Sequence, residues 1–178
     1  DGRGFRTHTE KPKEIEMSSP TPTPAVAATA RAIIHDLRAM QNSERAKGVQ
    51  QYFKHEIVAL GIDTPTLRGY CREQVKRLKP TWTIGEAIAL GELLLKEEEM
   101  ELRGAGFLIL GAFRKEFTPD LLPWAKRWLD TRLDNWALVD GFCSTVLSPL
   151  LEAHPSAEAT LRAWSRERVL WVRRAALV

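Results

Sequence analysis

The segment LDNWALVDGFCSTVL, residues 133–147, carries an indole and a carboxylate at a spacing that suits chemistry. Trp136 and Asp140 are four residues apart, and side chains at that spacing are neighbours on one face of a helix. An indole face attracts positive charge and a carboxylate pairs with it, so together they suit a planar cationic ligand in a cleft. The alternative is structural. An Asp in an apolar helix is more often bound to a neighbouring Arg than functional, because an unpaired buried carboxylate is costly.

A second pair of this kind lies in RERVLWVRRAALV, residues 166–178. Trp171 and Arg174 are three residues apart on one helical face, and Arg173 and Arg174 are flanked by apolar residues. Such an Arg is expected either to form a buried ion pair, for which Asp140 is a possible partner, or to face a cleft. In a cleft its planar guanidinium would suit a phosphate group.

The other basic residues occur in several clusters rather than in one run. Most such side chains lie on solvated faces. If folding brings the clusters to one concave side, they form an electrostatic groove for a phosphate backbone. The clusters contain Arg68, Arg72, Lys76, Arg77 and Lys79; Arg114 and Lys115; Lys126, Arg127 and Arg132; and Arg162, Arg166 and Arg168.

Several other chemistries are excluded by the sequence. It contains no Walker A motif and no H-E-x-x-H, which removes P-loop nucleotide hydrolysis and zinc proteolysis. Cys71 and Cys143 are isolated and no Cys/His cluster exists, so we expect no zinc site and no disulfide framework. We also expect no other metal and no cofactor. The net charge of +3 permits nucleic acid as a partner without requiring it. We expect a cytoplasmic protein, because the cysteine usage suits a reducing compartment and no stretch is apolar enough to span a membrane.

The elements that must position these side chains are helices. From Ala25 onward, apolar residues recur at three- and four-residue steps, as in AKGVQQYFKHEIVALG and MELRGAGFLILGAF, and no alternating strand pattern appears. Breaks at Gly and Pro predict roughly nine or ten short helices. Such a chain forms either a globular bundle or a stack of helical hairpins, and the absence of a clear fixed-period repeat leaves both open.

Local signals predict several boundaries. Gly61 is expected to end a helix as the residue after its C-cap. The Thr-Pro pairs at 64–65 and 118–119 each predict an N-cap followed by Pro. Asp134 is expected to cap the helix that carries the Trp-x-x-x-Asp pair.

The domain organisation is simple. Residues 1–24 have almost no apolar periodicity, and Pro alternates with Ser and Thr at their end, so we expect a disordered leader. Residues 25–178 are expected to form one helical domain. Its pattern is still helical at Val178, so we expect this domain to be truncated at its C-terminus.

Four stretches, in order, resemble segments of the AlkD-like DNA alkylation repair family, which are DNA glycosylases built of HEAT-like repeats. YFKHEIVALGIDTPTLRGYCRE carries the family's Gly-Ile-x-Thr-Pro-x-x-Arg turn, and EEEMELRGAGFLIL its acidic entry to a middle helix. LDNWALVD is similar to the Trp-x-x-x-Asp motif, and LWVRRAAL to a Trp-x-x-Arg-x-Ala segment. The resemblance covers about Gln50 to Val178. It implies an all-α fold of helical hairpins stacked into a curved solenoid with a concave basic face.

The resemblance also implies roles for individual residues. Trp136 would pack against the lesion nucleotide, and Asp140 would be the catalytic carboxylate. Arg174 would hold the DNA backbone beside the lesion, with Trp171 and Arg173 as neighbours in that region. The family has a further active-site Trp downstream of this Arg, and the sequence ends before reaching it.

The implied function is a monofunctional DNA glycosylase, a hydrolase that cleaves the N-glycosidic bond of cationic alkylated purines such as N3-methyladenine and N7-methylguanine. The implied partner is double-stranded DNA with alkylated bases, bound by a monomer. Two alternatives stay open. One is a non-catalytic helical scaffold for DNA or protein, in which Asp140 and Arg174 form a structural ion pair. The other is a family member that binds branched or unmodified DNA without excising bases.

Overall fold

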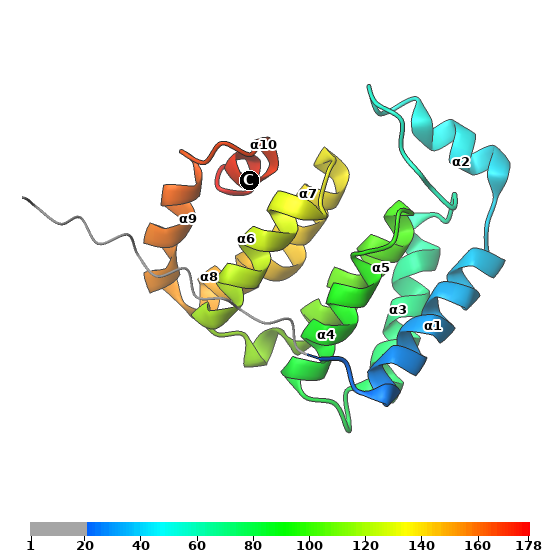
Figure 1. Ribbon diagram of the computed structural model, residues 1–178, viewed down its shortest axis with the longest axis horizontal. Coiled ribbons are helices and arrows are strands. Elements are labelled where there is room, and N and C mark those ends of the chain that lie inside the picture. Colours follow the sequence, from blue (N-terminus) through cyan, green and yellow to red (C-terminus); the bar gives the residue numbers. More distant parts are fainter. Residues whose placement is uncertain (1–20) are drawn as a thin grey trace, which may run out of the picture.

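The chain folds into helices, as Figure 1 shows for the computed structural model, which describes residues 21–178. Within this range the all-helical prediction is confirmed, since the β-type pairing is limited to an isolated bridge between Val58 and Glu99. The α-helices are α1 (Pro24–Ala39), α2 (Ser43–Gln50), α3 (Thr64–Leu78), α4 (Ile84–Leu94), α5 (Met100–Leu110), α6 (Leu122–Thr131), α7 (Trp136–Phe142), α8 (Ser148–Ala153), α9 (Glu158–Trp164) and α10 (Leu170–Ala175). Shorter turns are the 3-10 segments η1 (Gly111–Glu116), η2 (Pro119–Leu121) and η4 (Pro155–Ala157), and the π-helical η3 (Cys143–Leu147).

Helix α1 begins just before the predicted domain boundary at Ala25. Thr23 is its N-cap, and the Thr23 hydroxyl accepts the backbone N–H of Val26 at 3.2 Å. Pro24 follows as the first helical residue, where its missing N–H leaves no helical bond unmade. Most of the predicted leader, residues 1–20, lies outside the described residues.

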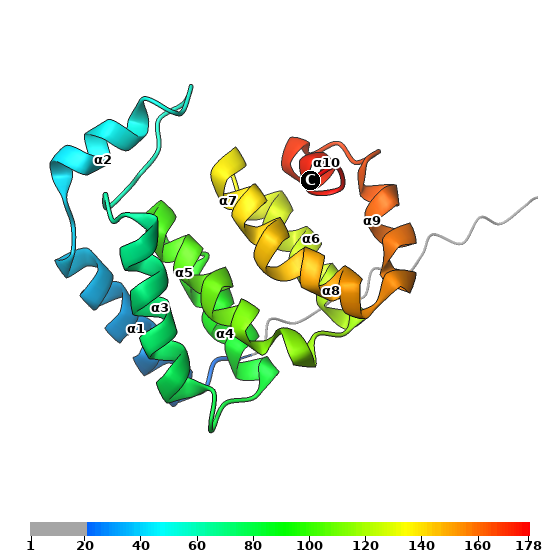
Figure 2. The ribbon, with the colours of Figure 1, turned by 180° about the vertical axis from the view of Figure 1, so that it is seen from behind.

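The helices form two rows. One row contains α1, α4 and α6, and the other contains α3, α5 and α7, as the opposite views in Figures 1 and 2 show. The contacts agree, because α1 packs on α4, α3 on α5, and α5 on α7, while α10 packs on α6 and α7. The short connection between α4 and α5 makes them an antiparallel hairpin that links the rows. In the range from residue 21 to 178, no helix is long and apolar enough to cross a membrane.

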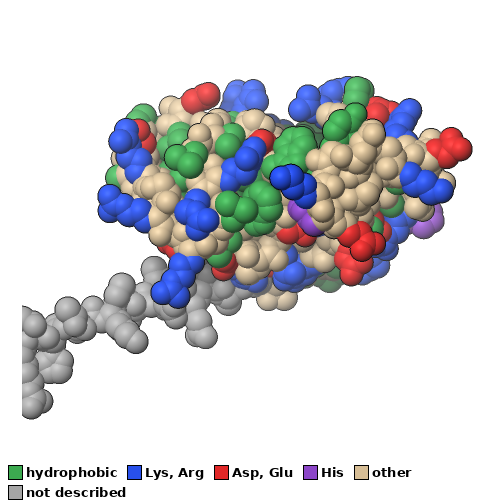
Figure 3. Space-filling view, turned by 90° about the horizontal axis from the view of Figure 1, so that it is seen from above, with side chains coloured by type: hydrophobic (Ala, Val, Ile, Leu, Met, Phe, Trp, Pro, Cys, Tyr) green, Lys and Arg blue, Asp and Glu red, His purple; other side chains and the backbone are tan. Residues whose placement is uncertain are grey.

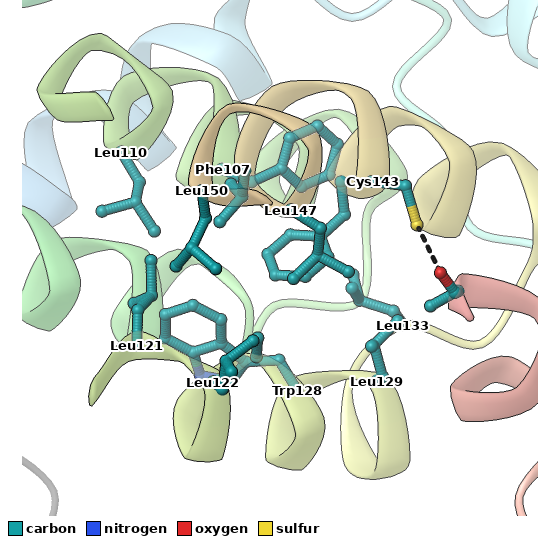
Figure 4. Packing of buried hydrophobic residues seen from close by; sticks show 14 of the residues in the cluster. Phe107, Leu110, Leu121, Leu122, Trp128, Leu129, Leu133, Cys143, Leu147 and Leu150 are labelled. Carbon is teal, nitrogen blue, oxygen red and sulfur yellow. Dashed lines mark hydrogen bonds between the residues drawn. The ribbon is translucent and has the colours of Figure 1, made fainter. Parts of the chain in front are cut away.

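Two apolar clusters fill the space between the rows, and the α4–α5 hairpin contributes to both. One cluster includes Leu37 of α1 and Leu67 of α3. The other is centred on Trp128 of α6 and Phe142 of α7, and Figure 4 shows Phe107 of α5 packed into it. Burial of each such large side chain stabilises the fold by roughly 1.5–3 kcal/mol. The hairpin therefore has a core on each of its two sides.

The prediction that a helix continues to Gly61 is wrong, because α2 ends at Gln50 and residues 51–63 are not helical. The backbone N–H groups of residues 60–62 donate to the buried carboxylate of Glu101, at 2.8 to 3.2 Å, and not to helical carbonyls. Gly61 has a φ of 76°, and an added Cβ would overlap the backbone of Asn42 and Ala46 in the first turn of α2. Gly61 therefore turns the chain toward α3 and ends no helix.

Two predicted N-caps are each wrong by one residue. Helix α7 is capped by Asn135, whose side-chain oxygen accepts a backbone N–H of the first turn at 3.0 Å. The predicted cap, Asp134, forms an ion pair with Arg103 at 2.9 Å. Helix α3 is capped by Asp63, and Thr64 is already helical. In both places two capping-type residues are adjacent, so the sequence alone does not decide which one is used.

Candidate functional site

Helix α7 exposes Trp136 and Asp140 to solvent, because its other side packs in the core. Asn135, which is completely buried, fixes the start of the helix, and Leu138, Val139 and Phe142 are buried. Trp136 is left 43% exposed. The predicted helical spacing is confirmed, so the indole and the carboxylate lie one turn apart on a solvent-accessible face.

Asp140 and Arg174 form a bidentate ion pair between α7 and α10. The Nε and Nη2 groups of Arg174 donate to the two carboxylate oxygens of Asp140, both at 2.7 Å. The hydrogen bond to Asp140 raises the pKa of Arg174 above its ordinary value. The two side chains are 34% and 37% exposed, so this pair lies at the surface and not in the core. The structure thus brings together two of the predicted site residues, and solvent reaches both.

The two remaining predicted site residues on α10 have other surroundings. Trp171 is partly buried and packs against the larger apolar cluster. Arg173 donates from Nη1 to the backbone carbonyls of Glu167 and Arg168, at 2.9 and 2.6 Å. Arg173 therefore stabilises the turn that leads into α10. The position of Arg174 on α10 depends on this turn.

An aromatic residue that the sequence did not single out also reaches this site. Phe53, from the non-helical segment after α2, stacks on Trp136 with ring centroids 5.5 Å apart and an interplanar angle of 21°. In Figure 1 this segment lies at the top of the molecule, at the same end as the start of α7 and as α10. The stack could not be found from spacing, because the two rings come from distant parts of the chain.

A groove lies beside this face, between α3 and α7. Its apolar part, of about 520 Å³, is lined by Leu67 of α3 and Phe107 of α5, together with Ala137 and Gly141 of α7. Consecutive helical residues point about 100° apart, so Ala137 and Gly141 lie on the α7 face adjacent to that of Trp136. The groove is therefore a neighbour of the Trp-Asp face.

The groove continues into a basic part of about 540 Å³. Arg68, Arg72 and Lys76 follow one another at four-residue steps along α3, and Arg114 of η1 joins them. The two parts share Arg68, so they are contiguous. Within residues 21–178, Arg68, Arg72 and Arg114 have no ion-pair partner, which leaves their charge available to an anion. Folding thus brings members of two of the four basic clusters of the sequence to one groove.

Residues of the other two basic clusters are engaged elsewhere. Lys126 pairs with Glu167 at 2.6 Å, and Arg162 with Glu158 at 2.7 Å. Figure 3 looks onto the end of the molecule that is uppermost in Figure 1, and it shows Lys and Arg side chains around apolar ones. The positive charge on this face therefore occurs in separate groups and does not form one continuous band.

The buried carboxylate of Glu101, which the sequence did not single out, holds a segment that reaches the site. Glu101 belongs to the acidic stretch at the start of α5, yet it is only 8% exposed. It accepts the three N–H groups of residues 60–62, which fixes the end of the segment that carries Phe53. The acidic run gave no signal for this role, because Glu97 and Glu99 of the same run pair instead with Arg38.

Both cysteines are buried and form no disulfide. Burial raises the pKa of both thiols from 9.0 to about 12, and for Cys143 the nearby Asp140 adds to this effect. The Cys143 thiol contacts the backbone oxygen of Ala175 at 4.0 Å, as Figure 4 shows. Neither thiol is poised as a nucleophile, because the thiolate is the reactive form.

Comparison of the sequence with known families identifies the family of this chain. No curated protein matches the sequence. The sequence profile of a family described as DNA alkylation repair enzyme matches residues 33–178, a range that includes Phe53, Trp136, Asp140 and Arg174. This match covers most of the chain, from within α1 to the last residue. The chain therefore belongs to the DNA alkylation repair enzyme family.

Proposed function

We propose that this protein is a DNA glycosylase that hydrolyses the N-glycosidic bond of cationic alkylated purines in double-stranded DNA. Membership of a family of DNA repair enzymes supports DNA as the partner. The observation that carries the proposal is the solvent-accessible Asp140 carboxylate, one helical turn from the exposed Trp136 and bound to Arg174. We also propose that the two rows of helices form a HEAT-like curved scaffold whose inner side is the groove between α3 and α7.

The chemistry needs little from the protein. Alkylation at N3 of adenine or N7 of guanine places a positive charge on the base, which then leaves without help from a general acid. Cleavage develops oxocarbenium charge on the sugar, and a fixed carboxylate such as that of Asp140 stabilises this charge and orients the attacking water. The indole of Trp136 contributes cation–π and CH–π contacts to the sugar and base. No step requires a metal.

Arg174 has enough donors to serve both the carboxylate and the DNA. A guanidinium has five N–H groups, and the bidentate pair uses one on Nε and one on Nη2. The remaining N–H groups can donate to a phosphate beside the lesion while Asp140 stays oriented. In this proposal Arg174 fixes the carboxylate and the backbone relative to each other, and the cations of α3 bind further phosphates of the duplex.

A second function is favoured by the same ion pair. If Asp140 and Arg174 only join α7 to α10, the protein is a helical scaffold that binds DNA without excising bases. The two functions differ in one measurement, which is the release of free methylated base from a duplex treated with a methylating agent. Glycosylase activity predicts release of N3-methyladenine or N7-methylguanine above the spontaneous rate, whereas the scaffold predicts binding of the duplex without release.

A further inference from the structure

The segment between α2 and Val58 is held in a defined shape although it is not helical. The side-chain amide of Gln50 donates to the backbone oxygen of His55 at 2.8 Å and accepts the N–H of Ile57 at 3.0 Å. Further along, the backbone oxygen of Val58 accepts the N–H of Met100 at 2.9 Å. Gln50 thus binds backbone groups on the far side of Phe53, and the Val58 bond joins the segment to α5, so the backbone around Phe53 is held in a defined shape.

Phe53 is the contact that orients the indole of Trp136. Trp128 and Trp164 are 0% and 4% exposed and are held by the core, whereas Trp136 is 43% exposed. Within residues 21–178, the ring of Phe53 is the one aromatic ring stacked on Trp136, and the indole N–H has no hydrogen-bond partner. Since nothing in the core restrains this indole, the stack restricts its rotation about the side-chain torsions.

The stack also determines which surface of the indole a ligand meets. A ring has two faces, and Phe53 covers one face of Trp136 at a centroid distance of 5.5 Å. A sugar or base that approaches Asp140 therefore meets the opposite face or the edge. Contacts between an indole and a cationic sugar depend on this orientation, because positive charge is attracted to the face of the ring and not to its edge.

We infer that Phe53 is a positioning residue for the excision reaction, which acts by holding Trp136 in the orientation that contacts the sugar of the lesion nucleotide. This inference rests on the proposed glycosylase function. It assigns to the segment after α2 a role in the rate of the chemical step. The cations of the groove, by contrast, contribute to binding of the duplex.

The test uses Phe53→Ala, with Phe53→Tyr as the conservative variant. Val58→Ala is the matched control, because Val58 lies in the same segment, is exposed, and lines a different cavity together with Arg103 and Asp134. Each variant is assayed for single-turnover release of methylated base and for the Kd of the DNA. Quenching of Trp136 fluorescence by acrylamide is also measured for each variant. The Trp136 signal is obtained by subtracting the fluorescence of the same variant with the additional substitution Trp136→Phe.

We expect Phe53→Ala to slow single-turnover release about tenfold, since small misplacements of a positioning group cost this much or more. The Kd should change little, and the Trp136 signal should become more accessible to acrylamide. Phe53→Tyr should restore both release and protection, and Val58→Ala should match the wild type. The inference is overturned if Phe53→Ala releases base at the wild-type rate, or if it binds DNA more tightly and reacts faster, which would make Phe53 an obstacle. If the wild-type protein itself releases no base, the proposed function fails instead, and the acrylamide result alone reports whether Phe53 orients the indole.

Discussion

Arg174 donates one hydrogen bond of 2.7 Å to each carboxylate oxygen of Asp140, and this pair joins α7 to α10 at the surface of the protein. Both partners are about one-third exposed, so the pair is neither hidden in the core nor free in solution. Without DNA, a purely structural ion pair and a substrate-binding pair would therefore have the same geometry. They differ in what happens when a cationic lesion and a phosphate arrive, and this difference can be measured.

Replacement of Arg174 should affect DNA binding and excision more than stability. The free energy of unfolding of Arg174→Ala should fall by no more than about 1 kcal/mol, because exposed ion pairs contribute little. Excision should fall for Arg174→Ala and also for Arg174→Lys, since Lys keeps the charge but cannot bind both carboxylate oxygens in a fixed plane. Urea unfolding and single-turnover release measure the two effects. Excision by Arg174→Lys at the wild-type rate would contradict the positioning role of the guanidinium.

The basic part of the groove should bind DNA phosphates. Arg72→Ala should weaken binding and reduce the slope of log K against log salt by about one unit, because one fewer counterion is released. Arg31→Ala is the control, since Arg31 has the same charge but lies on the outer surface of α1, in a different cavity. Fluorescence anisotropy with an unmodified duplex at several salt concentrations measures both. Equal slopes for the wild type and Arg72→Ala would remove Arg72 from the interface.

Gly61 should be essential for stability although it lies in a loop. An added Cβ would be 2.2 Å from the backbone oxygen of Asn42, and a φ of 76° disfavours any L side chain. Gly61→Ala should lower the free energy of unfolding by more than about 2 kcal/mol, from backbone strain and steric overlap together. Gly48→Ala, where nothing lies within 4 Å, should raise it by up to about 1 kcal/mol. Similar urea midpoints for the two variants would show that the turn at Gly61 is not required.

The buried thiols should make stability depend on pH in the alkaline range. The folded protein raises the pKa of Cys71 and Cys143 from 9.0 to about 12, so the unfolded chain loses these protons first. Their contribution is fully present below pH 9 and is lost between about pH 9 and 12, at up to about 1.4 kcal/mol per pH unit for each thiol. Urea unfolding at pH 8 to 10.5 should show a smaller decline for Cys143→Ala than for the wild type. An identical decline would mean that Cys143 does not titrate differently in the two states.

Much of the fold followed from helical periodicity. The spacing of apolar residues after Ala25 predicted an all-helical chain. This prediction is confirmed best for the helices whose apolar face packs in the core. The stretch 46–61 has the same spacing but forms only the short α2 and an irregular segment. Its helical tendency is overridden, because Gln50 and Glu101 bind its backbone groups directly. Glu101 lies 40 residues after Gly61 in the sequence, so the local pattern could not predict its contribution.

The site was predictable to a similar extent. The helical spacing placed Trp136 and Asp140 on one face, and the apolar flanks of Arg174 predicted either a position in a cleft or a buried ion pair, for which Asp140 was a possible partner. The pair is present but is not buried, because α10 meets α7 at the edge of the core. Phe53 remained hidden, since no spacing rule connects it to an indole on another helix.

The most direct test of the account is base release by Asp140→Asn. The substitution keeps the size of the side chain and one acceptor oxygen, but removes the negative charge that would stabilise the oxocarbenium ion. The wild-type protein and Asp140→Asn are incubated with a methylated duplex, and free N3-methyladenine and N7-methylguanine are quantified, with thermal unfolding as the check on folding. The account predicts release by the wild type and none above the spontaneous rate by a folded Asp140→Asn. Release by Asp140→Asn at the wild-type rate would contradict it.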